Sequence, residues 1–268
     1  MNIRILSRDQ NILKFMLEDV DVAFANALRR IILAEVPTMA IEEVIIIENT
    51  SPLFDEILAH RLGLIPLKTD LEHYVLPEEC SCEGAGCSQC QLTFTLEREA
   101  EEDGVTVYSG ELKSQDPLVV PVSDKIPIVR LARGQRIVLE AYACLGKGKD
   151  HAKYQPVSSC AYKYKPIVQL EVDKCEACGD CVEICPKGVL DLKNKSIMIK
   201  DVFNCSLCKS CEEECEFDAI HVDFDDSSFI FTIESTGALP PEEIVKKAVE
   251  IFEGKVKELK ALLSSTTS

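Results

Sequence analysis

The sequence predicts an α+β fold that consists mainly of β-strands, with a few helices and one short cysteine-rich segment. Apolar and polar residues alternate near the N-terminus and through much of 67–165, as they do in half-buried strands. Apolar residues recur at helical spacing in 21–35 and 240–263. Eight cysteines crowd into the 41 residues from 175 to 215, where bound metal could substitute for a large apolar core. The chain has 268 residues, enough for two or three domains.

The N-terminal part contains the plainest local signals. Residues 3–17 alternate on both sides of a polar turn and predict a β-hairpin. Asp21 can cap a helix that ends before Pro37, because the residue before a proline disfavours helical geometry. The β-branched run 41–47 predicts a strand that is half to fully buried, and 53–62 predicts a short helix.

The remaining elements lie on either side of the cysteines. Proline, glycine and acidic turns punctuate 67–165, which we expect to be mainly β. Between 167 and 224 the predicted order is strand, cysteine loop, hairpin, cysteine loop and strand, a twofold repeat. A strand at 229–233 follows. Pro240 and Pro241 then open a long helix, at the end of a helix where proline is tolerated.

The eight cysteines form two runs of identical spacing, C-x2-C-x2-C-x3-C. Ferredoxins hold iron–sulfur clusters with this spacing, and the fourth cysteine of each run then binds the other cluster. We therefore predict two [4Fe–4S] clusters, with [3Fe–4S] as an alternative for one of them. The first predicted ligand set is Cys175, Cys178, Cys181 and Cys215. The second predicted set is Cys205, Cys208, Cys211 and Cys185.

The residues around these runs fit the cluster pattern, with one departure. Gly179 suits a loop that folds tightly around a cluster, and Pro186 follows Cys185 as the pattern expects. Glu216 stands where the second run would have its proline. Two all-cysteine zinc sites are the alternative, although zinc sites rarely take four evenly stepped cysteines from one loop.

A third group of thiols lies within 11 residues: Cys80, Cys82, Cys87 and Cys90. Four thiolates at this spacing can close a tetrahedral structural zinc site that leaves no open position for catalysis. A loop of free thiols is the alternative, but such thiols are reactive when exposed. Cys144 and Cys160 have no near partners in the sequence, and we expect both to be small buried residues.

The predicted C-terminal helix carries a strict apolar seam. Its members step by 4, 3, 4, 3 and 4 residues: Val245, Val249, Phe252, Val256, Leu259 and Leu263. This pattern indicates packing against a helix of another chain. An ordinary amphipathic helix that packs on its own domain is the alternative.

Composition and charge exclude several classes of function. No apolar run reaches the ~18–20 residues of a membrane span, and we expect no secretory leader. Fourteen cysteines then indicate metal ligation in a reducing cytoplasm. The net charge of −17 argues against general attraction to nucleic acid. The segment from Lys147 to Lys165 holds five lysines and one acid, and we expect a solvated loop face there, with a local basic contact as the alternative.

No catalytic centre is recognisable in the sequence. Gly146-Lys147-Gly148 lacks the spacing of a phosphate-binding loop. The four histidines are scattered and have no recognisable nucleophile near them in the sequence: His60, His73, His151 and His221. We therefore expect that the chain has no active site of its own.

Four motifs follow one another along nearly the whole chain: DVAFANALRRIILAEVPTMAI at 21–41, DEILAHRLGLIPL at 55–67, GKGKDHAKYQP at 146–156 and ESTGALPPE at 234–242. Together they resemble the alpha-like assembly subunits of cellular RNA polymerases. That family joins the bacterial alpha subunit with its eukaryotic and archaeal counterparts. Ferredoxin-like cysteines inside such a chain are typical of the archaeal branch.

The resemblance implies a discontinuous, alpha-subunit-like dimerisation domain formed by residues 1–48 and 225–268. A mostly β domain at 49–165 would be inserted in it, followed by a ferredoxin-like iron–sulfur domain at 166–224. The cysteine loop at 80–90 is similar to a metal-binding loop of some eukaryotic relatives.

The resemblance also implies a non-catalytic role in transcription, in the assembly of DNA-directed RNA polymerase. The dimerisation domain would pair with a smaller alpha-like subunit, called L in archaea. The heterodimer would dock the two large catalytic subunits and the small subunits N and P, so that nucleic acid is met only through the assembled enzyme. Its iron–sulfur clusters would be structural or regulatory.

Two sets of contact residues are implied by position in the family. The first helix would share the interface with L through Phe24, Leu28 and Ile31, together with the seam residues. A large subunit would be contacted by Arg29, Arg30, His60 and Arg61, for which surface solvation is the alternative.

A ferredoxin-like electron-transfer subunit of an oxidoreductase is the alternative function. It accounts for the eight cysteines and for the acidity, since acidic carriers commonly dock on basic partners. It leaves the seam helix and the motifs at 21–41 and 55–67 without an explanation.

Overall fold

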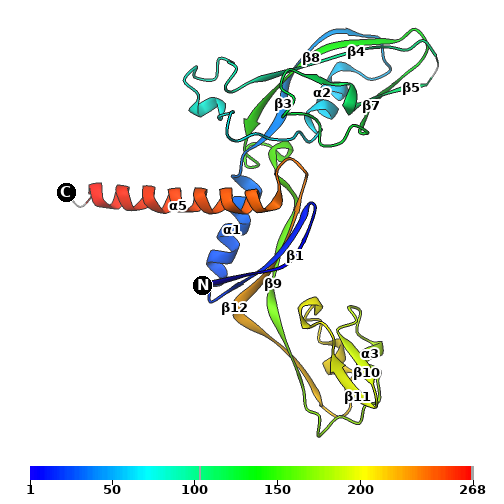
Figure 1. Ribbon diagram of the computed structural model, residues 1–268, viewed down its shortest axis with the longest axis vertical. Coiled ribbons are helices and arrows are strands. Elements are labelled where there is room, and N and C mark those ends of the chain that lie inside the picture. Colours follow the sequence, from blue (N-terminus) through cyan, green and yellow to red (C-terminus); the bar gives the residue numbers. More distant parts are fainter. Residues whose placement is uncertain (103, 267–268) are drawn as a thin grey trace. The chain divides into compact units, whose positions relative to one another are not determined.

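The computed structural model describes residues 1–102 and 104–266, which divide into two compact units (Figure 1). Of the described residues, the first unit contains 1–7, 14–26 and 161–232, and the second contains 8–13, 27–102, 104–160 and 233–266. Both units mix strands with helices, so the predicted α+β class is confirmed. Within the described residues, no helix is long and apolar enough to cross a membrane.

The second unit is built on an antiparallel sheet in the order β3-β8-β4-β6, with a smaller sheet of β5 and β7. The strands are β3 (Thr38–Asn49), β4 (Leu92–Glu99), β5 (Val105–Tyr108), β6 (Lys113–Ser114), β7 (Pro127–Leu131) and β8 (Arg136–Gly146). The predicted short helix is α2 (Asp55–Gly63), which contacts β3 and β7. Short 3-10 turns are η1 (Pro77–Glu79), η2 (Ser109–Glu111) and η3 (Ala152–Tyr154).

Alternation along β8 shows where the core of this unit lies. Every second residue of β8 is buried, from Ile137 to Leu145. Because successive side chains of a strand point to opposite faces, one face of the sheet carries the core. Phe94 of β4 and Leu62 of α2 are completely buried in that same core. The core therefore fixes α2 and the start of β4, between which the first cysteine loop lies.

β3 departs from the prediction in its second half. Its first four residues are buried, but Ile45 and Ile47 are 53% and 64% exposed. The predicted burial of 41–47 is therefore wrong for these two residues. β3 is an edge strand of a sheet whose core lies on one face, so consecutive β-branched side chains cannot all be buried.

Two longer helices confirm the helical patterns of the sequence. α1 (Val22–Ala34) begins as predicted, because the Asp21 carboxylate accepts a 2.7 Å hydrogen bond from the backbone N–H of Phe24. In α5 (Pro241–Thr266), Ile244 and Ala248 are completely buried. Every side chain from 253 to 265 is exposed, on the half of the helix that leads to the C-terminus (Figure 1). α5 therefore has a packed half and an exposed half.

Most of a four-stranded sheet in the order β1-β2-β12-β9 belongs to the first unit. Its strands are β1 (Asn2–Asp9), β2 (Ile12–Glu18), β9 (Val157–Leu170) and β12 (Ile220–Ser235). β1 and β2 form the predicted hairpin, and β12 is one strand where the sequence predicted two. Aromatic rings pack on this sheet: Phe15 stacks on Phe231 with centroids 5.1 Å apart, and Tyr162 meets Phe229 edge-on at 5.4 Å.

The cysteine-rich segment follows the predicted twofold repeat. Each cysteine run contains one helical turn, α3 (Asp180–Glu183) or α4 (Ser210–Glu213). Between them lies an antiparallel hairpin of β10 (Leu190–Lys193) and β11 (Ser196–Ile199), and η4 (Val202–Asn204) precedes the second run. The segment connects β9 to β12, so two strands of one sheet carry it.

The core of the second unit yields a direct test. Replacement of Phe94 by alanine should lower the free energy of unfolding by about 3–5 kcal/mol, because a fully buried ring leaves a cavity. Leu118→Ala is the control: this side chain is 60% exposed, and the change should stay within about 0.5 kcal/mol. Urea titration of both variants measures the difference, and equal midpoints would contradict the placement of the core.

Candidate metal centres and docking surfaces

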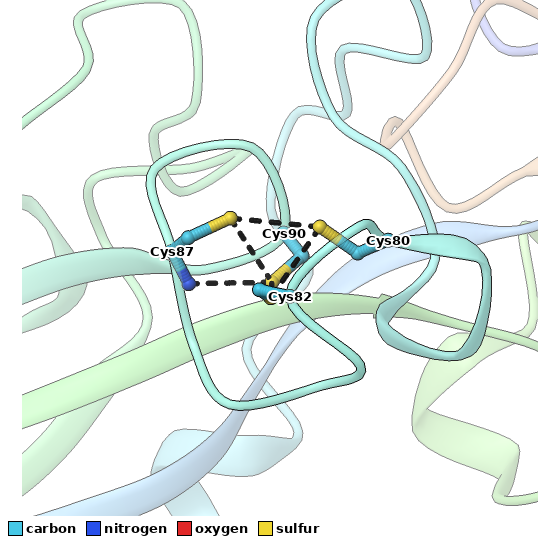
Figure 2. A group of neighbouring side chains, drawn as sticks. All are labelled: Cys80, Cys82, Cys87 and Cys90. Atoms are coloured by element: carbon cyan, nitrogen blue, oxygen red, sulfur yellow. Dashed lines mark hydrogen bonds between the residues drawn. The ribbon is translucent and has the colours of Figure 1, made fainter.

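Four sulfur atoms converge in the loop between α2 and β4. The Sγ atoms of Cys80, Cys82, Cys87 and Cys90 lie within 4.8 Å of one another and point toward a common centre (Figure 2). Three of the sulfur–sulfur distances are 3.5 Å and a fourth is 3.9 Å. A tetrahedron with metal–sulfur bonds of about 2.3 Å has edges of about 3.8 Å. The four thiols could therefore hold one metal ion.

Left-handed backbone conformations give this loop its tight shape. Glu83, Gly84 and Gly86 have φ angles of 53°, 80° and 86°, which glycine adopts without steric cost. The N–H of Cys90 donates to the carbonyl of Cys87 at 3.0 Å and closes the turn at the second pair of thiols. These contacts lie within the loop itself and help to set the spacing of the four thiols.

The thiols of this loop differ strongly in acidity. Hydrogen bonding to the Cys80 and Cys90 thiols lowers the pKa of Cys82 to about 6. Burial raises the pKa of Cys90 to about 12. At neutral pH the loop therefore favours one thiolate, at Cys82, surrounded by thiols that stabilise it. A metal ion would have to displace the remaining protons.

The two cysteine runs fold into loops of the same backbone shape. Ala177 and Gly179, two and four residues after the first cysteine of their run, have φ angles of 56° and 99°. Leu207 and Lys209 occupy the same places in the second run, with φ angles of 60° and 61°. Gly179 thus permits the tight loop as predicted, whereas Lys209 adopts the conformation against the steric preference of a residue with a Cβ.

The first predicted ligand set gathers around one buried thiol. Cys181 is 7% exposed, and burial raises its pKa, with further contributions from Cys178, Cys175 and Cys215. The fourth member comes from the end of the second run, and its Sγ accepts a 3.4 Å hydrogen bond from the N–H of Ala219. The structure thus brings these four cysteines into one neighbourhood.

The second set gathers around one cavity. Cys185, Cys205, Cys208 and Cys211 all line it, with Val168 and Val222 among its apolar walls. Burial raises the pKa of Cys211 to about 11, and Cys185 and Cys205 contribute to the shift. The fourth cysteine of the first run is therefore placed beside the second run.

The distances between sulfur atoms distinguish the two cysteine runs from the loop at 80–90. Among the residues that the structure describes, only that loop brings three or more ligand atoms within 4.8 Å of one another. The thiols of the two runs are spread more widely than one ion can span, whereas several irons bridged by sulfide span wider sets. Thiolates too widely spaced for one ion are the donors that an iron–sulfur cluster would take, and such a cluster would supply bonds that organise the segment.

The seam of α5 is mainly at the surface. Val249, Val256, Leu259 and Leu263 are 48%, 42%, 58% and 60% exposed, while Val245 and Phe252 are half-buried. The folded chain therefore leaves most of this apolar stripe in water. Single exposed apolar residues are ordinary, but a continuous stripe of them marks an interaction surface.

The other predicted contact residues divide by exposure. Phe24 is half-buried, whereas Leu28 and Ile31 are only 2% and 5% exposed and thus have little surface to offer another chain. Arg29 is half-buried, and Arg30, His60 and Arg61 are exposed. The guanidinium of Arg61 donates to the carbonyl of Pro127 at 2.9 Å, which holds this side chain against β7.

An apolar surface on α2 was missed by sequence reasoning. Phe54, Ile57 and Leu64 are 78%, 49% and 51% exposed, beside the buried Leu58 and Leu62. The signal was present in the motif at 55–67, because a short helix that buries one face cannot bury apolar residues on all sides. These three residues and the exposed His60 and Arg61 are here called the α2 surface.

A polar network at Tyr154 also had no sign in the local sequence patterns. The Tyr154 hydroxyl donates to Glu42 at 2.7 Å, lies 3.4 Å from the Sγ of Cys144, and burial raises its pKa. Lys153 pairs with the same Glu42 carboxylate. Cys144 is half-buried and has a partner, so its prediction as a simple buried residue is wrong, whereas Cys160 is buried as predicted.

The lysine-rich segment 147–165 is not a solvated face, contrary to the prediction. Four of its five lysines are held within the chain by acids or by a carbonyl: Lys147 by Glu78 at 2.6 Å, Lys153 by Glu42, Lys163 by the Cys205 carbonyl at 2.6 Å, and Lys165 by Glu18 at 3.1 Å. The acids come from distant parts of the sequence, which is why local composition could not reveal these pairs.

Comparison with known proteins gives consistent results. The model of the family "RNA polymerase Rpb3/Rpb11 dimerisation domain" matches residues 14–256. The chain is 45% identical to "DNA-directed RNA polymerase subunit Rpo3" of Methanosphaera stadtmanae, over 95% of this chain and 96% of that protein. It is 44% identical to the proteins of the same name from Methanosarcina acetivorans, over 98% of each chain, and Archaeoglobus fulgidus, over 97% of each.

Metal affinity of the loop at 80–90 should depend steeply on pH. Above pH about 6 Cys82 is already a thiolate, so binding of one zinc ion should release roughly three protons. Below that pH Cys82 is protonated as well, and affinity should fall more steeply. Competition with a chromophoric chelator between pH 5 and 8 measures this, with Cys160→Ser as the control. An affinity independent of pH would contradict thiolate ligation.

Proposed function

The chain belongs to the RNA polymerase Rpb3/Rpb11 dimerisation-domain family, and on this premise we propose that it is a non-catalytic assembly subunit of archaeal DNA-directed RNA polymerase. The relatives named above match it from end to end and are subunits of that enzyme. The alternative function, an electron-transfer subunit of an oxidoreductase, has no support among these matches.

The exposed seam of α5 is the observation that carries the proposal. Val256 and Leu259 lie in the half of the helix where every described side chain is exposed. Burial of each Val or Leu side chain is worth about 1.5–3 kcal/mol. A helix with a matching seam is the partner that such a stripe fits, and L, the smaller alpha-like protein, would provide it.

The first helix contributes less to this interface than the resemblance implies. Phe24 has surface for a contact with L. Leu28 and Ile31 are buried within the chain, so they would support α1 from behind rather than touch L. We therefore place the partner contact mainly on α5, with Phe24 as an additional contact.

The α2 surface is the proposed docking site for a large catalytic subunit. Phe54, Ile57 and Leu64 supply exposed apolar area, and His60 and Arg61 supply polar groups beside it. Arg29 and Arg30 of α1 would add contacts to a large subunit. The small subunits N and P would join the assembled platform, and nucleic acid would be reached only through the whole enzyme.

The cysteines are proposed to hold structural metal. Zinc fits the loop at 80–90, because its sulfur–sulfur distances of 3.5–3.9 Å match a tetrahedral ion. Iron–sulfur clusters fit the two wider sets, which explains the twofold repeat. Their thiolate bonds would organise a segment with a small apolar core, and their loss would be a means of regulation. Such sites are expected in the reducing cytoplasm.

The seam can be tested with a matched pair of substitutions. Leu259→Asp should weaken binding of L at least about a hundredfold, since a buried charge in a helix interface is strongly unfavourable. Ala261→Asp adds the same charge two residues away, on the opposite face of the helix by heptad position. Titration by calorimetry measures both affinities. Equal losses, or none, would contradict the proposed interface.

A second pair tests the α2 surface. Phe54→Ser removes the most exposed apolar side chain of this surface and should lower the yield of the complex with the large subunits several-fold. The Tm of the chain should not change, because the ring is 78% exposed. Glu56→Ser, an exposed position on α2, is the control. Reconstitution followed by gel filtration measures assembly, and unchanged yields with Phe54→Ser would place docking elsewhere.

A further inference from the structure

Strand β9 presents two different faces within the first unit. Tyr162 and Tyr164 pack against aromatic residues of β12, with Tyr164 and Phe224 centroids 4.7 Å apart. Lys163 and Lys165 alternate with the tyrosines and therefore point to the opposite face. Aromatic and basic side chains thus alternate along this part of β9, and the two ammonium groups lie on one face.

The two lysines have different partners. Lys165 is paired with carboxylates, Glu18 at 3.1 Å and Asp225 at 3.9 Å. Lys163 is half-buried, and its Nζ donates a 2.6 Å hydrogen bond to the carbonyl oxygen of Cys205. Among the described residues, no carboxylate oxygen lies within 4.0 Å of the Lys163 Nζ, the greatest distance for an ion pair. A carbonyl rather than a carboxylate therefore holds this ammonium, although the chain carries a net charge of −17.

The two cysteine groups have different charged neighbours. Lys187 and Lys209 line the same cavity as the four cysteines of the second group, and Lys209 lies 3.7 Å from Glu212. Near the first group, Lys174 is bound by Glu171 at 2.7 Å. His221 lies 3.4 Å from Glu171 and 3.5 Å from Glu212. The two groups thus share one backbone shape but differ in their electrostatic environment.

We propose that Lys163 is a positioning residue for the second cysteine group, which couples that group to the sheet and offsets its negative charge. Cys205 is the first cysteine of its run, so a bond to its carbonyl fixes where the loop begins relative to β9. Four thiolates around a cluster carry net negative charge, and a nearby ammonium in a partly buried site favours the more negative, reduced form. The inference rests on the proposed iron–sulfur content of the two runs.

Three substitutions in the full-length chain separate the effect of the Lys163 charge from the effects of its side-chain shape and of the neighbouring Lys165. Lys163→Met keeps an apolar stem and removes the charge, and Lys163→Arg keeps the charge. Lys165→Met is the matched control, since it removes the neighbouring ammonium, whose partners are carboxylates rather than a cysteine. All three are also made in a Cys178→Ser background, which removes a ligand from the first set only, so that changes in the second cluster can be separated from changes in the first.

The measurements are iron and acid-labile sulfide per chain, and a redox titration followed by electron paramagnetic resonance without oxygen. In Lys163→Met the ratio of reduced to oxidised second cluster at a fixed potential should fall roughly tenfold, a midpoint about 59 mV lower for one electron. Loss of the second cluster from this variant alone would also support the proposal. Lys163→Arg should restore most of the potential, and Lys165→Met should leave it unchanged.

Three outcomes would overturn the inference. Equal midpoints in wild type and Lys163→Met would show that the ammonium does not act on the cluster. Equal loss in Lys163→Met and Lys163→Arg would show that side-chain shape, rather than charge, decides. The first two outcomes would leave the proposed cluster content intact. A Cys178→Ser chain that takes up no iron and sulfide would overturn that cluster content, and this inference with it.

Discussion

The apolar seam of α5 is the main physical constraint on this chain, because its own unit does not bury it. Isolated helices of fewer than about 12–15 residues are marginal in water, and every side chain from 253 to 265 of α5 is exposed. Ile244 and Ala248 anchor the first half, and Lys255 pairs with Glu35 at 2.8 Å to set the direction of the helix. A partner helix would remove the stripe from water and also hold the exposed turns. A scaffold function follows from this incomplete burial.

The two kinds of cysteine site have one proposed purpose, which is to order short segments of the chain by metal ligation. The main core of the second unit is large, whereas the cysteine-rich segment has two small buried clusters of four and three residues, each with a cysteine among them. So little apolar burial cannot offset the chain entropy of an ordered segment, and thiolate bonds can supply the difference. In the loop at 80–90 the sulfurs stand close enough for one ion, whereas no three thiols among the described residues of the two runs lie within 4.8 Å of one another. The loop at 80–90 and the two cysteine runs therefore differ in the distances between their sulfur atoms more than in the number of sulfur atoms.

Several lysines of this acidic chain are held in internal contacts. Lys147 and Lys153 hold loops of the second unit through Glu78 and Glu42, and Lys163 and Lys165 do the same on β9. The exposed apolar side chains of α5 and α2 thus belong to a chain whose net charge is −17. This arrangement suits docking with other protein chains better than direct contact with nucleic acid.

The sequence by itself determined most of the elements and the twofold cysteine repeat, because both follow from local spacing. The hairpin at β1 and β2, the Asp21 cap and the repeated cysteine loops all depend on residues a few positions apart. Only the tertiary structure decided which side chains remain at the surface. Leu28 and Ile31 are buried while Phe54 and Ile45 are exposed, although all four are apolar. Gly148 is needed because a Cβ there would collide with the carbonyl of Leu33, and Cys144 meets Tyr154. Exposure and close approach depend on which distant segments pack together, and no local pattern encodes that.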